Sequence, residues 1–334
     1  MTQKDLVVIG AGPAGLAAAI AAQKSGLDYL VLERGVLVNA IFRFPTNMVF
    51  FTTPELLEIG GFPFITPYEK PTRLEALRYY RRVVDALDLS VSFGESVMAV
   101  SQGEHGLSVE TLSDGDQSRV IQTKTVILAT GSYDQPNLLN IPGENLSHVS
   151  HYYREAHSYY RKRVVVVGGK NSAAETALDL YRNGARVTLV HRQACLSEGI
   201  KYWVLPDIEN RIKEESIDGR FKTRVIEIRA TSVVIECAGV QEEIPADAVF
   251  LLTGYRPDTD LLTRCGIRFD SETCIPEYDE KTFETNVPNL FLAGQIVAGV
   301  HGGKVFIENG RFHGESVVAG IVERLNKDEV PSTV

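Results

Sequence analysis

The segment Val7–Gly15 (VVIGAGPAG) decides the fold of this chain, and Val165–Ala173 (VVVGGKNSA) repeats its pattern 158 positions later. Each segment follows a run of β-branched residues and precedes an alanine-rich stretch with helical spacing. In that context, glycines allow a tight turn and let backbone N–H groups approach a pyrophosphate, which the N-terminus of the following helix stabilises. Two such units predict two dinucleotide sites, one for a flavin nucleotide and one for a nicotinamide nucleotide.

The residue that ends the second strand of each unit distinguishes the two sites. Glu33 lies eighteen positions after Gly15, and His191 lies eighteen positions after Ala173, with Arg192 beside it. A carboxylate here accepts hydrogen bonds from both ribose hydroxyls and repels a 2′-phosphate, whereas a cation favours that phosphate. The first site is therefore predicted to hold FAD and the second to prefer NADPH to NADH. The alternative is that Glu33, His191 and Arg192 are ordinary surface residues at strand ends.

These patterns predict the residues that contact each cofactor. The expected FAD contacts come from the first turn, three strand ends and the C-terminal element: Gly10, Gly12, Pro13, Ala14, Gly15, Glu33, Arg34, Ala129, Thr130, Gly131, Gly294, Gln295 and Lys304. The expected NADPH contacts come from the second turn and its strand ends: Gly168, Gly169, Lys170, Asn171, Ser172, Ala173, His191, Arg192 and Gly254. The sequence assigns no catalytic residue.

Length and composition fit a globular protein with two domains. The chain has 334 residues, of which 44% are hydrophobic and 23% are charged, and this length allows two cores of common size. The net charge of −9 at pH 7 argues against a nucleic-acid partner, because such proteins usually present a basic face. No apolar run is long enough to cross a membrane, and the first strand follows Met1 too closely for a signal peptide. We therefore expect no membrane association and a cytoplasmic location.

The four cysteines show no redox or metal-binding pattern. They are Cys195, Cys237, Cys265 and Cys274, and they form no C-x-x-C pair and lie outside both glycine turns. In a cytoplasmic chain such cysteines are expected to be free thiols. Their spacing matches no set of metal ligands, so we predict no metal site.

The order of the expected elements predicts an α/β fold in which one nucleotide-binding domain is inserted into the other. The expected strands are 5–9, 28–33, short strands over 91–128, one starting at Arg163 and more over 222–253, and the expected helices are 13–25, 72–87, 171–183 and about 304–325. We therefore expect two Rossmann-like domains. Residues 1–140 and 254–334 form the FAD-binding domain, and residues 141–253 form the inserted NADPH-binding domain.

The chain resembles the low-molecular-weight thioredoxin reductase class of two-dinucleotide flavoproteins in both fingerprints, in Ala129–Gly131 and in Ala293-Gly294. It is more specifically similar to the YpdA-type bacillithiol disulfide reductases, and the resemblance covers nearly the whole chain. The segments that carry the specific match are Phe50–Gly61 (FFTTPELLEIGG), Gly168–Ala173 (GGKNSA), Lys201–Asn210 (KYWVLPDIEN) and Lys304–Arg311 (KVFIENGR). The resemblance implies a homodimer or larger homo-oligomer in which a hydride passes from NADPH to FAD and on to a small disulfide or other acceptor.

Several positions depart from the patterns of these families. The redox C-x-x-C pair of thioredoxin reductases is absent from His148–Tyr153 (HVSHYY), so a dithiol relay to thioredoxin is not expected. Ala14 stands where the bacillithiol disulfide family typically has a cysteine, so a thiolate route lacks its nucleophile and bacillithiol disulfide reduction is expected to be slow. Gln295 replaces an acidic residue, and Lys170 replaces the second glycine of the NADPH fingerprint.

Three other functions remain open. An NADPH–ferredoxin or flavodoxin reductase, with a small redox protein as acceptor, needs no cysteine, because its electrons leave one at a time through the flavin edge. A flavin-binding redox sensor with low turnover belongs to a different class of protein. A flavin monooxygenase is more distant, since Glu144 to Tyr153 only loosely matches its linker fingerprint.

Two groups of polar side chains have both a structural and a functional interpretation. His301 and His313 flank the start of the C-terminal helix; solvated histidines are the favoured interpretation, and protonation of a reduced product near the flavin is the alternative. A second group lies in the linker: His148, His151, Tyr152, Tyr153, His157, Tyr159 and Tyr160. Linker packing is favoured there over a substrate pocket or proton relay.

Overall fold

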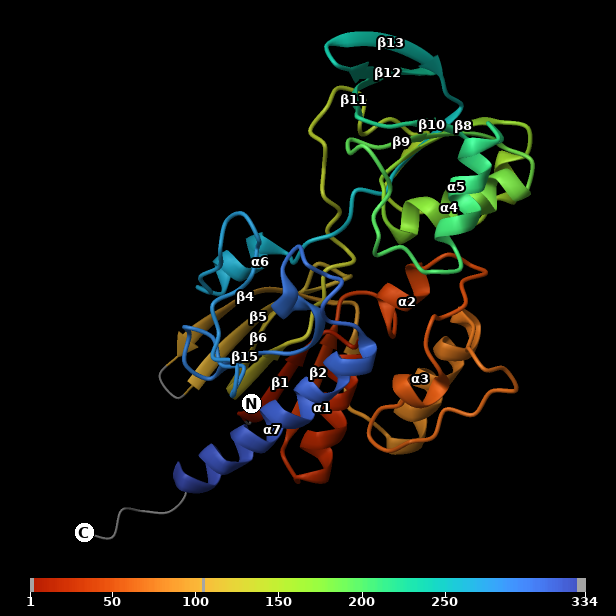
Figure 1. The fold of residues 1–334 in the computed structure, drawn as a ribbon. Helices are drawn as coiled ribbons and strands as arrows, with labels where there is room; N and C mark the ends of the chain where they lie inside the picture. The colour runs from red at the N-terminus through yellow and green to blue at the C-terminus, as the bar shows by residue number, and fades with distance from the viewer. Residues whose placement is uncertain (1–2, 104–105, 329–334) are drawn as a thin grey trace. The chain divides into compact units, whose positions relative to one another are not determined.

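The structure is a computed structural model that describes residues 3–103 and 106–328. The chain divides into two compact units (Figure 1): unit 1 consists of Met1–Phe42, Met48–Gln135 and Tyr255–Val334, and unit 2 consists of Arg43–Asn47 and Pro136–Gly254. Met1 and Thr2, on which the expectation of a missing signal peptide rests, lie outside the described residues. Within the described residues, no helix is both long enough and apolar enough to cross a bilayer.

The helices and strands follow the predicted order. In the first two segments of unit 1 they are β1 (Lys4–Ile9), α1 (Pro13–Lys24), β2 (Tyr29–Glu33), α2 (Asn39–Arg43, which ends at the unit boundary), η1 (Pro54–Leu57), α3 (Arg73–Leu87), β3 (Val91–Phe93), β4 (Glu95–Gly103), β5 (Gly106–Ser113) and β6 (Ser118–Leu128). Its last segment adds α6 (Thr259–Arg264), β15 (Leu290–Leu292), η3 (Gly294–Ala298) and α7 (Ile307–Asp328). Unit 2 contains β7 (Val149–Ser150), η2 (His157–Tyr159), β8 (Arg163–Val167), α4 (Asn171–Arg182), β9 (Arg186–Val190), α5 (Leu205–Lys213), β10 (Asp218–Arg220), β11 (Thr223–Ile228), β12 (Ser232–Cys237), β13 (Val240–Pro245) and β14 (Ala248–Leu251).

Unit 1 is built on a seven-stranded sheet in the order β3-β2-β1-β6-β5-β4, with β15 paired to β6. Strand β1 pairs in parallel with β2 and β6, and β15 pairs in parallel with β6 (Figure 1). Leu6–Ile9 is apolar and buried, as expected for a parallel strand covered on both faces. Because the carboxyl ends of parallel strands meet at one edge, the loops after β1, β2, β6 and β15 lie together, which is where dinucleotides bind in such sheets.

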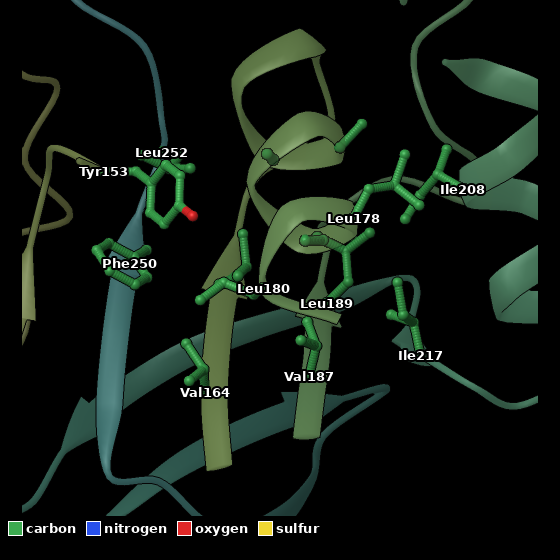
Figure 2. Close-up of a cluster of buried hydrophobic side chains, with 14 of the residues drawn as sticks. Tyr153, Val164, Leu178, Leu180, Val187, Leu189, Ile208, Ile217, Phe250 and Leu252 are labelled. Atoms are coloured by element: carbon green, nitrogen blue, oxygen red, sulfur yellow. The ribbon is translucent and has the colours of Figure 1, made fainter. Parts of the chain in front are cut away.

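Unit 2 contains a five-stranded parallel sheet, β10-β9-β8-β14-β7, and a three-stranded antiparallel sheet, β11-β12-β13. Figure 2 shows the core of the parallel sheet, where Leu178 and Leu180 of α4 lie over Val164 and Leu189. Together with unit 1, this parallel sheet confirms the predicted α/β fold class.

The linker tyrosines contribute to that core. The Tyr153 and Tyr159 rings meet the Phe250 ring edge to face, at centroid distances of 5.4 Å and 5.2 Å. The Tyr153 hydroxyl donates a short hydrogen bond to the Asp179 carboxylate on α4. Burial above all, and also the hydrogen bond to this carboxylate, raises the pKa of Tyr153 far above its ordinary value. The phenol therefore stays protonated. For these two tyrosines the packing interpretation is therefore correct.

The last helix begins three residues later than predicted, at Ile307 rather than about Lys304. The Asn309 side chain explains the difference. Its Oδ1 accepts the Phe306 N–H at 2.8 Å, and its Nδ2 donates to the Lys304 carbonyl at 3.0 Å. These two bonds hold the preceding residues in a turn, so they do not join the helix.

Candidate functional site

The first glycine turn is shaped by contacts that exclude side chains. Gly10 has a φ of +108°, and a Cβ there would lie 2.6 Å from the Ala129 carbonyl oxygen. A Cβ on Gly15 would lie 1.9 Å from the Gly10 carbonyl oxygen, whereas a Cβ on Gly12 would have open space around it. Gly12 is the extended N-cap residue of α1, and Pro13 follows it. The turn therefore leaves space for a phosphate at Gly12, at the N-terminus of α1. At Gly10 and Gly15, backbone carbonyl oxygens fill the space where a side chain would be.

Glu33, at the end of β2, is bound into this turn. Its two carboxylate oxygens accept the N–H groups of Ala11 and Gly35, each at 2.8 Å, and the side chain is buried, with 7% exposure. Burial raises the pKa of Glu33 and Asp134 adds to the rise, while the two backbone hydrogen bonds oppose it. Glu33 is thus not an ordinary surface residue. It is a fixed acceptor beside the turn, which fits the ribose of a dinucleotide.

The end of β6 contributes a polar atom without a partner. The Thr130 hydroxyl is buried and makes no hydrogen bond within the described structure. Gly131 follows with a φ of +66° and open space where a Cβ would be. A buried hydroxyl without a protein partner is what a hydrogen-bonding ligand at this strand end would satisfy. The residues of unit 1 therefore fit a bound dinucleotide.

An ion pair links the loops after β2 and β6. Arg34 Nη2 lies 2.9 Å from Asp134 Oδ2, and Asn39 Nδ2 donates to Asp134 Oδ1 at 3.4 Å. Asp134 could not be predicted from the sequence, because it lies about a hundred positions from its partner and belongs to no fingerprint. Arg34 thus has a structural ion pair at the edge of the predicted FAD site.

The C-terminal element lies directly against the first turn of α1. Gly294 has a φ of +78°, and a Cβ on it would lie 2.7 Å from the Ala14 Cβ. The Gln295 side-chain amide donates to the Gly302 carbonyl at 3.3 Å, and the Lys304 N–H donates to the His301 carbonyl at 2.9 Å. Gly294 is therefore brought to the turn of α1, while the Gln295 amide nitrogen binds its own loop and Lys304 is exposed.

The two histidines near this element have different environments. His301 is exposed, as expected. His313 is partly buried on α7, and its Nδ1 accepts the Gly294 N–H at 3.3 Å. The expectation of a solvated side chain is therefore wrong for His313. The sequence carries no signal for this contact, because it joins residues 19 positions apart across a loop.

The second glycine turn, in unit 2, repeats the backbone geometry with different side chains. Gly168 has a φ of +152°, and a Cβ on it would lie 2.6 Å from the Leu252 carbonyl oxygen and 2.8 Å from the Ala173 Cβ. Lys170 is the N-cap residue of α4 and has an extended backbone, with φ −118° and ψ −170°. A lysine is therefore accommodated at the position of the second glycine, and its exposed side chain stands at the helix N-terminus.

The loop that follows β9 is hydrogen-bonded to the second glycine turn and to the start of α4. The Asn171 Oδ1 accepts the Lys201 N–H at 2.9 Å, its Nδ2 donates to the Gly199 carbonyl at 3.1 Å, and the Ser197 N–H donates to the Gly169 carbonyl at 2.9 Å. Asn171 thus already has protein partners, while Ser172 is exposed at the first turn of α4. These bonds hold the loop beside the second turn.

His191 and Arg192, at the end of β9, differ in their charge. A Cβ on Gly169 would lie 2.2 to 2.4 Å from three atoms of the His191 ring, so the imidazole lies flat against the turn. Burial, and secondarily the positive charge of Arg192, lower the pKa of His191. The positive charge expected at this strand end therefore comes from the exposed Arg192, while His191 contributes a neutral ring.

Gly254 follows β14 at the same end of the parallel sheet as the second turn. It has a φ of +92°, and its carbonyl accepts the Asn137 N–H at 2.9 Å. The Thr253 hydroxyl donates to the Asn137 carbonyl at 2.6 Å. Asn137 was not predicted from sequence, and it fixes the backbone beside Gly254.

The cysteines offer little for thiol chemistry in unit 1. Cys265 and Cys274 are buried, and burial raises the pKa of Cys265 to about 11, so its thiol stays protonated. Cys195 and Cys237 are exposed and belong to unit 2. Within the described residues, no group of three or more His, Cys, Asp or Glu side chains is arranged to hold a metal ion.

Comparisons with known proteins show strong similarity over nearly the whole chain. Residues 7–294 match the family described as pyridine nucleotide-disulphide oxidoreductase. Bacilliredoxin reductase Bdr from Bacillus subtilis is 43% identical over 328 residues, which cover 98% of this chain and 100% of that protein. The structure of bacillithiol disulfide reductase Bdr (YpdA) from Bacillus cereus superposes with a TM-score of 0.94 at 43% identity, covering 97% of this chain and 100% of that one. Thioredoxin reductase from Lactococcus lactis shares the fold, with a TM-score of 0.75 at 23% identity and coverage of 97% and 100%.

Proposed function

Because the chain belongs to the pyridine nucleotide-disulphide oxidoreductase family, we propose that it transfers a hydride from NADPH to non-covalently bound FAD and reduces a small disulfide. The matches confirm the resemblance predicted from the sequence and identify the chain as an oxidoreductase. A flavin and a nicotinamide nucleotide are the cofactors that this family implies. FAD and NADPH are the specific forms that we propose. Bacillithiol disulfide, named in the description of the B. cereus relative, is the first candidate substrate.

The buried carboxylate of Glu33 is the observation that carries this proposal. It accepts one backbone N–H group from the first turn, that of Ala11, and one from the loop after β2, that of Gly35, and this position suits the ribose hydroxyls of FAD. Gly12 leaves the helix N-terminus accessible to the pyrophosphate, and the free Thr130 hydroxyl offers a further hydrogen bond. FAD, when bound, supplies the hydride and electron transfer chemistry, while these residues bind and orient it.

We assign NADPH to unit 2 on the basis of Arg192. Its exposed guanidinium stands at the end of β9, where the 2′-phosphate of NADPH would be bound. The neutral His191 ring lies against Gly169 and orients this end of the site. Lys170 would then meet the pyrophosphate at the N-terminus of α4.

A single anaerobic experiment tests the reaction. NADPH is added to the purified protein without oxygen while the flavin absorbance is followed, and a panel of acceptors is then supplied. We expect rapid bleaching, followed by slower reoxidation with a low-molecular-weight disulfide. Failure of NADPH to bleach the flavin would contradict the proposed activity and favour a low-turnover sensor.

An NADPH–ferredoxin or flavodoxin reductase is a second candidate. The lack of a reactive thiol among the described residues of unit 1 favours it. Ala14 cannot perform redox chemistry, and the buried Cys265 holds its proton because its pKa is about 11. A route through single electrons needs no thiol in unit 1. Reoxidation by ferredoxin or flavodoxin, without reoxidation by a disulfide, would select this function.

We also propose the domain limits and the assembly. Residues 1–140 and 254–334 would bind FAD, residues 141–253 would bind NADPH, and the protein would act as a homodimer in the cytoplasm. Limited proteolysis should cut within 132–150 and 254–262, and light scattering should give twice the chain mass of 36.8 kDa. Cuts confined to other regions, or the mass of a monomer, would contradict these limits or this assembly.

A further inference from the structure

His313 belongs to no fingerprint, yet it joins two elements of the predicted flavin site. The imidazole lies on α7, and its Nδ1 accepts the N–H of Gly294, the residue that follows β15 by two positions. Gly294 in turn lies against Ala14, at the first turn of α1. The side chain therefore bonds to a backbone group of η3 that lies against the first turn of α1, the helix N-terminus where a dinucleotide is proposed to bind.

The packing of α7 allows this close approach. A Cβ on Gly310 would lie 3.3 Å from the Gly294 Cα, and a Cβ on Gly314 would lie 2.6 Å from the Ala18 backbone nitrogen. Two glycines four residues apart thus bring one face of α7 onto α1 and onto Gly294. His313 immediately precedes Gly314, so its position is fixed by this tight contact.

Phe283 packs against the imidazole ring of His313 at a conformational cost. Its ring centroid lies 4.5 Å from that of His313, and its backbone has a φ of +59°, which a bulky residue rarely adopts. Its carbonyl also accepts the Leu292 N–H at 3.0 Å, two residues before Gly294. One strained residue thus contacts both the ring of His313 and the strand that carries the turn.

The charged groups around His313 do not stabilise its protonated form. On the loop that carries Phe283, the titratable and charged side chains are Tyr278, Asp279, Glu280, Lys281 and Glu284. Residues 307–326 of α7 add Glu308, Arg311, Glu315, Glu323 and Arg324, and α1 carries only Lys24, its last residue. Glu284 is bound by Arg324 at 2.7 Å. Burial lowers the pKa of His313, so the ring is neutral at physiological pH.

We propose that His313 is a positioning residue of the flavin site. The neutral imidazole holds the Gly294 peptide in place beside Ala14, and protonation of the imidazole releases FAD. A protonated imidazole carries a hydrogen on both nitrogens, so Nδ1 can no longer accept the Gly294 N–H. The turn then loses its support beside Ala14. This inference rests on the proposed FAD site of unit 1.

Two substitutions separate the hydrogen bond from the bulk of the side chain. In His313→Asn, the amide Oδ1 is the same number of bonds from the backbone as Nδ1 and can accept the Gly294 N–H, but it does not titrate. In His313→Leu, the acceptor is lost. His157→Asn, at an exposed position in unit 2, is the matched control for removing a histidine.

The measurement is FAD retention by the holoprotein, followed by absorbance after gel filtration at about pH 8 and about pH 5. The acidic sample is set well below the ordinary histidine pKa, because burial lowers the pKa of His313. Wild type and His157→Asn should bind FAD about tenfold more weakly at the acidic pH, because one hydrogen bond is lost. His313→Asn should lose much less affinity on acidification, and His313→Leu should be about tenfold weaker at both pH values. Any acid effect of Glu33 is common to all four proteins and cancels.

The outcomes distinguish the inference from the proposed function. An equal acid loss in wild type and His313→Asn, or wild-type retention by His313→Leu at about pH 8, would overturn the role of His313. If the leucine variant does not fold, the asparagine comparison decides alone. A wild-type protein that binds no flavin at either pH would instead overturn the proposed function.

Discussion

The two glycine turns have nearly the same backbone and very different side chains. In unit 1 a Cβ on Gly10 would lie 2.6 Å from a carbonyl oxygen of the neighbouring strand end, and in unit 2 a Cβ on Gly168 would lie at the same distance from the equivalent atom. Both N-cap residues, Gly12 and Lys170, have extended backbones. The shared requirement is thus the close contact between turn and sheet, which the first glycine of each turn provides.

The difference lies in what occupies the end of the second strand. Glu33 is buried and accepts two backbone hydrogen bonds, whereas His191 lies with its ring against Gly169 and leaves Arg192 exposed. One end is a fixed acceptor, and the other is a neutral surface with a cation beside it. Two copies of one turn are therefore specialised by the residues around them, and this comparison can be tested residue by residue.

The largest effect should come from the third glycine of the first turn. Gly15→Ala would place a methyl group 1.9 Å from the Gly10 carbonyl oxygen, so the backbone must shift. We expect the free energy of unfolding to fall by about 3 kcal/mol and FAD binding to be lost. Gly169→Ala meets the His191 ring, which can move, and should cost about 1 kcal/mol. Urea unfolding followed by circular dichroism measures both.

Gly12→Ala is the control for this comparison, because a Cβ there has open space. Its stability without cofactor should equal that of wild type, while its affinity for FAD falls. If Gly15→Ala were no less stable than Gly12→Ala, the tight turn inferred for unit 1 would be wrong.

Glu33→Gln should have the second largest effect. A glutamine has one acceptor oxygen where the carboxylate uses two, so the N–H of Ala11 or Gly35 faces an amide N–H₂. We expect FAD to bind about a hundredfold more weakly, from one unsatisfied donor and weaker ribose contacts. Fluorescence titration of the apoprotein with FAD measures this, and an unchanged dissociation constant would remove Glu33 from the site.

Arg192→Ala tests the corresponding position of unit 2 and should have a smaller effect. Loss of a charge-assisted bond to the 2′-phosphate should raise the KM for NADPH about tenfold and leave that for NADH little changed. Steady-state rates with an artificial acceptor measure both constants, and Arg186→Ala, at the exposed start of β9, is the control. Equal weakening of both nucleotides would contradict the 2′-phosphate role.

Ala14→Cys should have the smallest effect and is the one expected gain. Wild-type reduction of bacillithiol disulfide should be slow, and the new thiol should raise it about threefold, equivalent to less than about 1 kcal/mol of barrier. The gain is small because position 14 lies beside Gly294, where a thiol has little freedom to reach a substrate. NADPH oxidation by artificial acceptors should not change. Fast wild-type turnover that persists without the four cysteines would show that no thiol is required.

The fold could be predicted from the sequence because its signals are local. Gly10, Gly12 and Gly15 act within one turn, and β-branched runs and alanine-rich stretches indicate the strands and helices around it. The limits of α1 and α4 differ from the predicted ones by a single residue. The start of α7 was less predictable, because the Asn309 side chain competes with the helix for backbone groups.

The site was only partly predictable. The positions of Glu33 and Arg192 follow from their spacing to the turns, but their environments do not. The neutral state of His191 depends on burial against Gly169, and the inert thiol of Cys265 depends on its place in the core of unit 1. Periodicity carries no information about either environment.

The sequence by itself determined the fold class and the two turns, and it predicts the kind of nucleotide that each turn selects, because those properties depend on residues within one β-α-β unit. Only the tertiary structure decided which polar groups are already partnered. Arg34 binds Asp134, and His313 binds Gly294. Each of these contacts joins segments that are separated along the chain and brought together by sheet order and helix packing, and that order is set by the burial of the whole unit rather than by any local pattern.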